Sequence, residues 1–126
     1  MAKAAGIGGF FFRARDHEAL AKWYEEHLGV TECWAQNGGL TVFAPFTRET
    51  DYFAADKQWM LNFRVDDLDQ VLRDLRAAGI AVETRPDEWD NPETGRFARI
   101  QDPENNPIEL WEPPSEMRRS QAVPPA

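Results

Sequence analysis

Asp102-Pro103-Glu104-Asn105-Asn106-Pro107-Ile108-Glu109-Leu110-Trp111 is the stretch of this 126-residue chain that decides its fold. Its first six residues are Asp, Pro, Glu and Asn, a composition typical of a turn. Its last four residues, 108–111, predict a short strand that follows this turn. The segment before it, 97–101, also predicts a strand. The turn is therefore expected to join two strands.

Two helices are predicted from apolar side chains that recur at intervals of three and four residues. The first, about 17–28, begins after the N-cap residue Asp16 and ends before Gly29. The second begins after Asp67 and ends at Gly79. Further strands are predicted at 7–15, 30–36, 40–44, 59–65 and 80–84, with a hairpin turn at Asn37-Gly38-Gly39 and irregular connections at 45–57 and 85–96.

The two halves of the chain resemble each other. Phe12-Arg13-Ala14-Arg15 aligns with Phe63-Arg64-Val65-Asp66, and Leu28-Gly29-Val30 aligns with Ala78-Gly79-Ile80. Each half therefore predicts a strand, a helix and about three further strands. Two such βαβββ units give an α+β fold, in which the duplicated units form a curved eight-stranded sheet that encloses a cavity.

The length of the chain is that of one ordinary domain. We expect a single domain over 1–112, with its repeats at about 7–44 and 58–112. The segment 113–126 is rich in proline and predicts a tail without regular structure.

Composition and charge exclude several classes of protein. The chain has 14 Lys and Arg against 22 Asp and Glu, and its net charge of −8 repels nucleic acids and anionic membranes. Cys33 is the only cysteine, which excludes an intramolecular disulfide and a cysteine metal cluster. Patterns typical of a secretory signal or a transmembrane span are absent from the sequence. We therefore expect a cytoplasmic protein that binds neither nucleic acid nor membrane.

Four of these segments together resemble the vicinal oxygen chelate superfamily, which includes glyoxalase I, bleomycin-resistance proteins and extradiol dioxygenases. They are Phe12-Arg13-Ala14-Arg15-Asp16, His27-Leu28-Gly29-Val30, Phe63-Arg64-Val65-Asp66-Asp67 and the turn and strand at 102–111. The resemblance covers about residues 7–112. It implies the duplicated βαβββ fold, a homodimer and a small-molecule site between the sheets.

The resemblance also implies where a metal would be held. Metal-dependent members place His and Glu ligands at inward positions of the first and last strands of each half, and strand alternation assigns the two histidine positions to Gly9 and Met60. Glycine has no side-chain ligand, and a thioether is too soft for these metals. Glu109 keeps the carboxylate of the last strand, but one ligand does not hold a metal. We therefore expect no metal and no other cofactor.

The candidate site consists of side chains that face the expected cavity. Glu109 is either a member of a structural ion-pair network with Arg13, Arg64 or Asn62, or a carboxylate that contacts a ligand or acts as a general base. Aromatic and thioether side chains would suit a flat or cationic ligand, although core packing is the alternative for them. The predicted ligand-binding residues are Phe11, Arg13, Met60, Asn62, Arg64 and Trp111.

Other residues near this site are left open by the sequence. Arg99 and Phe97 share the predicted strand 97–101, and its inward register is not determined. Trp89 and the aromatic residues of 45–57 are assigned to loop anchoring or dimer contacts rather than to chemistry, although long loops often border binding sites.

The predicted function is the binding of a small organic molecule, cationic or aromatic, by sequestration or recognition, as the resemblance to bleomycin-resistance proteins implies. The alternative is a glyoxalase-like lyase or isomerase, in which Glu109 is the general base and Arg13 or Arg64 the electrophile. A third possibility is a vestigial pocket in a subunit that serves protein association. The sequence identifies neither the ligand nor whether the site lies within one chain or between two swapped chains.

Overall fold

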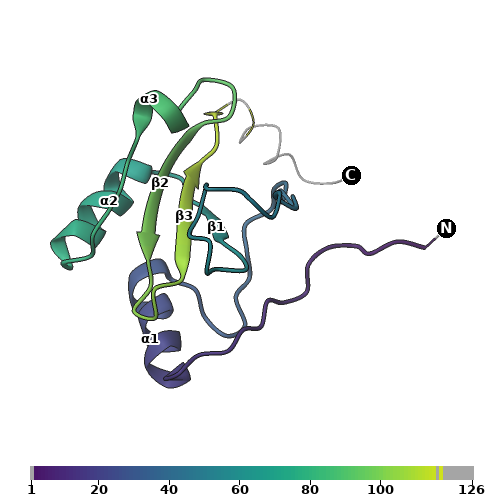
Figure 1. The fold of residues 1–126 in the computed structure, drawn as a ribbon, viewed down its shortest axis with the longest axis vertical. Helices are drawn as coiled ribbons and strands as arrows, with labels where there is room; N and C mark the ends of the chain where they lie inside the picture. Colours follow the sequence, from purple (N-terminus) through teal and green to yellow (C-terminus); the bar gives the residue numbers. More distant parts are fainter. Residues whose placement is uncertain (1, 116, 118–126) are drawn as a thin grey trace.

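The computed structural model of the protein describes residues 2–115 and 117. Its helices are arranged around a small sheet (Figure 1). The helices are α1, His17–Leu28, α2, Leu68–Ala77, and α3, Pro86–Trp89. The strands are β1, Leu61–Arg64, β2, Arg96–Gln101, and β3, Pro107–Glu112. No helix among the described residues is long and apolar enough to cross a membrane.

The two longer helices are confirmed, and both ends of α1 and the beginning of α2 lie where the capping residues predict them. Helix α2 ends at Ala77, two residues before the predicted end at Gly79. The Asp16 side chain accepts a hydrogen bond from the Ala19 N–H at 3.1 Å, which satisfies a free donor in the first turn of α1. Gly29 ends α1 with a left-handed backbone, φ 70°, which glycine adopts without steric cost. Asp67 caps α2 in the same way by accepting from the Gln70 N–H.

The sheet has the strand order β1-β3-β2, with β3 parallel to β1 and antiparallel to β2. The predicted strands at 59–65, 97–101 and 108–111 are thus present, with shifted ends. The predicted strand at 80–84 is reduced to an isolated bridge between Glu83 and Arg99. The connection at 85–96, expected to be irregular, contains α3, which begins at a proline as short helices often do.

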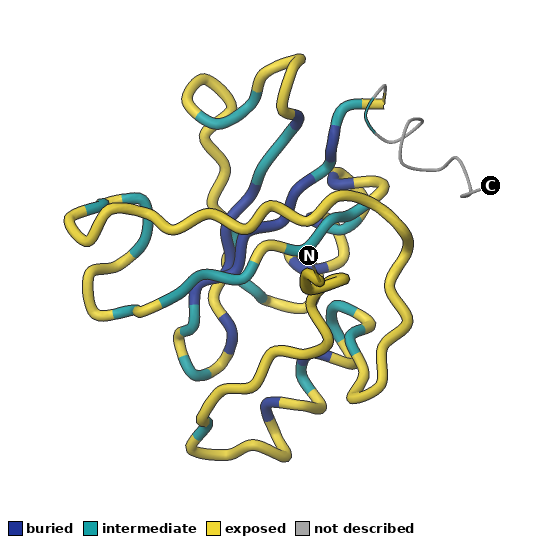
Figure 2. The backbone as a smooth tube through the Cα atoms, turned by 90° about the vertical axis from the view of Figure 1, so that its right-hand side faces the viewer, coloured by how far each residue is buried: buried dark blue, intermediate teal, exposed yellow. Residues whose placement is uncertain are grey.

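The core lies between one face of the sheet and the two longer helices. Ile108 and Leu110 of β3 are completely buried, and they alternate with Glu109, which faces the opposite side. Figure 2 shows this buried region as the dark blue segments at the centre of the tube. The remaining buried apolar side chains of this core are Leu20, Tyr24, Leu68, Leu72, Leu75, Ala98 and Ile100.

The turn between β2 and β3 is built around the buried carboxylate of Asp102. It accepts hydrogen bonds from the Tyr24 hydroxyl at 2.7 Å, from the Asn106 side chain at 2.8 Å, and from the N–H groups of Glu104 and Asn106. Asn105 adopts the left-handed conformation, φ 65°, that asparagine tolerates in turns. The predicted turn is therefore confirmed, and it also attaches α1 to the sheet.

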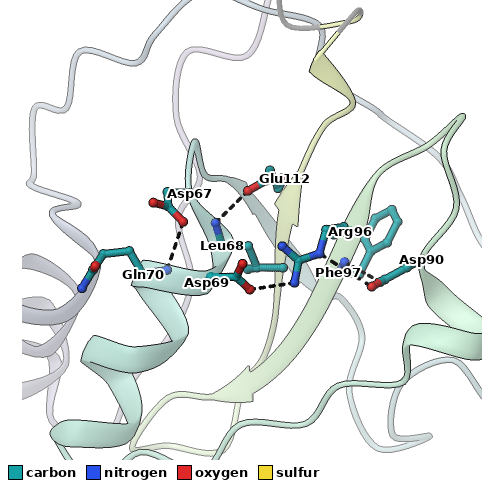
Figure 3. Close-up of polar contacts among 8 residues, drawn as sticks. All are labelled: Asp67, Leu68, Asp69, Gln70, Asp90, Arg96, Phe97 and Glu112. Carbon is teal, nitrogen blue, oxygen red and sulfur yellow. Dashed lines mark hydrogen bonds and ion pairs between the residues drawn. The ribbon is translucent and has the colours of Figure 1, made fainter.

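Polar contacts fix α2 and α3 against the sheet (Figure 3). The Glu112 side chain, at the end of β3, accepts a hydrogen bond at 2.9 Å from the first N–H of α2. Asp90, which follows α3, accepts one from the Phe97 N–H of β2 at 3.0 Å. The short helix α3 is therefore held beside β2.

The strands predicted in the first half are not formed. Segments 7–15, 30–36 and 40–44 have no strand, and Asn37-Gly38-Gly39 forms no hairpin, so the predicted eight-stranded sheet has three strands in the described part of the chain. A strand needs hydrogen bonds from a neighbouring strand, whereas a helix makes its own. Most of this half is exposed (Figure 2). The predicted tail at 113–126 lies for the most part outside the described residues.

Candidate functional site

The sheet places three polar side chains in a row on the face opposite the core. Asn62 of β1 is the register partner of Glu109 of β3, and Glu109 is the register partner of Arg99 of β2. Residues that are partners in neighbouring strands project to the same face of a sheet. Glu109 and Arg99 are each only 7% exposed, which is uncommon for charged side chains.

Glu109 is held in place by two hydrogen-bond donors. The Asn62 side chain donates to one carboxylate oxygen at 2.7 Å, and the hydroxyl group of Tyr52 donates to the other. Tyr52 belongs to the long connection 45–57, which therefore lies over this face of the sheet. A buried carboxylate needs such partners, because desolvation without them is costly.

The contacts of Tyr52 at this site change the pKa of its hydroxyl group. Its partial burial, together with the hydrogen bond to Glu109, raises the pKa of the Tyr52 hydroxyl to about 12, while the nearby Arg99 acts in the opposite direction. At neutral pH the hydroxyl is therefore protonated and serves as a donor to Glu109.

Arg99 lies close to two aromatic rings, which also contact each other. Its guanidinium carbon is 5.0 Å from the centre of the Tyr52 ring and 5.3 Å from that of Trp89. Trp89 ends α3, whose position beside β2 is fixed by the contact between Asp90 and Phe97 (Figure 3). The Nε and Nη2 atoms of Arg99 are buried and have no hydrogen-bond partner among the described residues.

We call Tyr52, Asn62, Trp89, Arg99 and Glu109 the Glu109 cluster. It combines a carboxylate, an amide and a guanidinium with two aromatic rings, all of them on one face of the sheet. A few fixed polar groups beside aromatic surfaces are typical of sites that bind small organic molecules.

The structure brings some of the predicted site residues together and separates others. Asn62 contacts Glu109 as expected, but Arg64 donates instead to the carbonyl oxygens of Asn37 and Gly38, at 2.9 and 3.1 Å. Arg13 is exposed, and among the described residues neither arginine pairs with Glu109. The ion-pair network expected around Glu109 is therefore not formed.

The apolar residues predicted at the site also differ in their surroundings. Trp111 is buried and stacks on Phe97, with ring centres 6.2 Å apart, and its indole N–H donates to the Thr94 carbonyl oxygen. Met60 is half-buried. Phe11 is 94% exposed, so it does not line an enclosed cavity in this single chain.

Sequence analysis did not assign Tyr52, Trp89 or Arg99 to the site. The long aromatic connection was the available signal for Tyr52, because such loops often border binding sites. Assigning Arg99 to the site requires the register of β2 against β3, which is known only once the two strands are seen to pair. Assigning Trp89 to the site requires the position of α3, and the sequence predicts an irregular connection there.

The donor atoms do not fit the divalent metal found in part of the resembled superfamily. Gly9 and Met60 occupy the two positions expected for histidine ligands, and neither offers a suitable donor. Within residues 2–115, no three His, Cys, Asp or Glu side chains converge on a point that could hold a metal ion. We therefore derive no step that involves a metal.

The surface has an open groove of about 630 Å³ beside α1. Its acidic residue Glu104 is already engaged, because its two oxygens accept the N–H groups of Arg15 and Asp16 at 2.7 and 2.9 Å. The groove is thus a weaker candidate than the Glu109 cluster. It is lined by Arg15, Asp16, Ala19, Leu20, Lys22, Trp23, Glu26, Pro103 and Glu104.

Comparisons with known proteins agree with this fold. A profile of the Glyoxalase/Bleomycin resistance protein/Dioxygenase superfamily matches residues 6–110. The uncharacterized protein YraH of Bacillus subtilis is 26% identical, over 76% of this chain and 89% of that protein. TnmS3, an antibiotic binding protein from Streptomyces sp. CB03234, has a TM-score of 0.58 and 23% identity, covering 90% of this chain and 99% of its own. A glyoxalase/bleomycin resistance protein from the same source has a TM-score of 0.46, 24% identity and coverages of 77% and 91%.

Proposed function

Because this chain belongs to the Glyoxalase/Bleomycin resistance protein/Dioxygenase superfamily, we propose that it binds a small organic molecule at the Glu109 cluster and acts by sequestration or recognition. The observation that carries the proposal is the row of Asn62, Glu109 and Arg99 beside the rings of Tyr52 and Trp89. The polar groups would fix the orientation of a ligand, and the rings would pack against its flat surfaces. A similar fold serves antibiotic binding in TnmS3.

Binding is favoured over catalysis by the positions of the proposed electrophiles. The lyase or isomerase alternative needs Arg13 or Arg64 beside Glu109 to stabilise the charge that forms on the substrate. Arg13 is exposed, and Arg64 donates to the carbonyl oxygens of Asn37 and Gly38. The donors that contact Glu109 are instead Tyr52 and Asn62.

We further propose that the protein works as a homodimer without a metal, and that its second copy covers the exposed apolar surface of the first half. In that dimer, segments 7–15, 30–36 and 40–44 would find partner strands, which would complete the eight-stranded arrangement and bring Phe11 and Arg13 toward a cavity. Large exposed apolar surfaces are typical of interaction sites. The exposed large apolar side chains of the described residues are Ile7, Phe10, Phe11, Phe12, Trp34, Leu40, Val42, Phe43 and Phe46.

The proposal is tested by the melting temperature of the chelator-treated protein. We expect no shift with Ni²⁺, Co²⁺, Mn²⁺, Zn²⁺ or Fe²⁺, and a shift of several degrees with at least one class of aromatic compound, since binding at about 100 times Kd adds roughly 2.7 kcal/mol. Glu109→Gln should weaken the effect of that compound. A reproducible shift with one metal, lost in Glu109→Gln, would contradict the metal-free site.

A second assay separates binding from catalysis. Proton exchange next to a carbonyl group is followed by NMR in the presence of candidate substrates, with wild-type protein and Glu109→Gln. We expect no exchange above the uncatalysed rate. Exchange that is lost in the folded Glu109→Gln variant would favour the lyase or isomerase function instead.

A further inference from the structure

The Arg99 side chain carries an inference about the class of ligand, which rests on the proposed function. We propose that Arg99 binds the carboxylate of an aromatic acid and that the site therefore selects aromatic carboxylates. Arg99 is only 7% exposed, and its Nε and Nη2 atoms have no hydrogen-bond partner among the described residues. Buried donors without partners are uncommon, because each one loses its hydration without replacement.

The two unpaired nitrogens point to a carboxylate rather than to a single acceptor. Nε and Nη2 lie on the same edge of the guanidinium plane, so their N–H groups project side by side. This spacing matches the two oxygens of a carboxylate, which can accept both bonds at once. Two rings lie close to the guanidinium, because Tyr52 and Trp89 have their ring centres 5.0 and 5.3 Å from its central carbon.

The neighbouring carboxylate does not fill this role. Glu109 is the register partner of Arg99, but its two oxygens accept from Tyr52 and Asn62, and the described residues contain no ion pair between Glu109 and Arg99. A cationic ligand placed at the free edge of Arg99 would meet a like charge in a buried setting, which is unfavourable. The local charge therefore favours an anionic group, although the net charge of −8 favours cations at long range.

Access to Arg99 depends on Tyr52. The backbone hydrogen bonds within 45–57 are local, between Thr50 N–H and Thr47 C=O and between Lys57 N–H and Ala54 C=O. The Tyr52 side chain connects this segment to the sheet through Glu109 and Arg99. A ligand that reaches the buried edge of Arg99 therefore has to move this segment, and the ring of an aromatic acid can then pack beside Tyr52 and Trp89.

The test compares three probes of one shape and different charge. Naphthoate, naphthamide and naphthylmethylammonium are titrated into the full chain by calorimetry. We expect naphthoate to bind about 10-fold or more tightly than either of the others, because a hydrogen-bonded charge pair contributes more than a neutral contact. In the wild-type protein, the Nε–H resonance of Arg99 should move downfield with naphthoate and stay in place with naphthamide.

Variants of Arg99 connect this preference to the side chain. Arg99→Lys keeps the charge but loses the paired donors, and we expect it to weaken naphthoate binding about 10-fold and naphthamide binding by less. Arg96→Lys is the matched control, because Arg96 lies on the same strand and pairs with Asp69 near the surface. If Arg99→Lys does not fold, the Nε–H shift in the wild-type protein decides the question.

The outcomes separate the two proposals. Equal binding of naphthoate and naphthamide, or an Nε–H resonance that does not move, would overturn the role of Arg99 and leave the small-molecule site standing. Tighter binding of naphthylmethylammonium would also overturn the role of Arg99, and it would support a cationic ligand at the small-molecule site. If no aromatic compound of any charge binds, the proposed function itself is wrong, and the role of Arg99 falls with it.

Discussion

The two halves of this protein carry similar local patterns and yet differ in structure. From residue 61 onward, three segments pair into a sheet, and the largest fully buried side chains are all in this half: Leu68, Leu75, Ile100, Ile108 and Leu110. In the first half, the corresponding segments form no strand and expose side chains such as Phe43, which is 84% exposed. The difference teaches that an apolar β-rich segment becomes a strand only where a neighbouring strand takes up its backbone hydrogen bonds.

Helix α1 is the exception within the first half. It forms because its hydrogen bonds are internal, and it buries Leu20 and Tyr24 against the core of the second half. The Tyr24 hydroxyl also reaches Asp102 at 2.7 Å. The first half is thus attached to the second through this helix and through aromatic contacts such as that of Phe12 with Trp59, whereas its strand-like segments lack partner strands.

The sharpest test of the comparison is a matched pair of leucine truncations. Leu110→Ala should lower the free energy of unfolding by about 3 kcal/mol, because it leaves a cavity among fully buried side chains. Leu40→Ala removes the same atoms from a residue that is 65% exposed, and it should cost under about 0.5 kcal/mol at concentrations where the chain is monomeric. Urea unfolding measures both. Equal losses would show that the two halves are equally well packed.

The proposed dimer is tested by placing a charge on the exposed surface of the first half. Phe43→Asp should raise the dimer dissociation constant about 100-fold, because a carboxylate would be buried without a partner. Light scattering over a range of concentrations measures this. Ala81→Asp is the control, since it adds the same charge at an exposed position of the second half and should leave the dimer intact. A wild-type protein that is monomeric at every concentration would refute the proposed dimer.

The attachment of α1 is tested by removing one hydroxyl group. Tyr24→Phe should lower the free energy of unfolding by roughly 1–2 kcal/mol, because Asp102 is buried and loses one of its donors. Tyr52→Phe also removes a donor from a buried carboxylate, Glu109, but Tyr52 is only half-buried, so water can replace its hydroxyl and the cost should be smaller. Chemical unfolding of the two variants side by side gives the difference. A larger loss in Tyr52→Phe would show that the connection at 45–57, rather than α1, holds the halves together.

The smallest effect is expected in the titration of the two tyrosines. Burial and the hydrogen bond to Glu109 raise the pKa of Tyr52 to about 12, and burial with the contact to Asp102 raises the pKa of Tyr24 further. A raised pKa in the folded state means that the stabilisation is complete below about pH 10 and is lost as the pH rises through about 12. The ultraviolet absorbance of tyrosinate should therefore appear at a higher pH in the folded protein than in the unfolded chain. Tyr52→Phe should remove the absorbance change that comes first as the pH rises. A tyrosine that ionises near pH 10 in the folded protein would contradict the buried contact.

The sequence predicts some of the side-chain contacts around Glu109 and not others. Asn62 was placed beside Glu109 by strand alternation, which requires no knowledge of distant contacts. Arg64 was assigned to Glu109 by the same reasoning, but its long side chain reaches the carbonyl oxygens of Asn37 and Gly38 instead. Arg99 could not be placed, because its neighbours depend on the register between two strands.

The sequence by itself determined the two longer helices, their N-caps, the turn at 102–107 and the family, because these depend on interactions between residues a few positions apart. Asp16 with Ala19 and Asp102 with Asn106 are examples. Only the tertiary structure decided which strands pair and which side chains surround Glu109. Tyr52 and Asn62 lie 57 and 47 residues away from Glu109 along the chain. Contacts at such separations arise from the packing of whole elements, which no local pattern specifies.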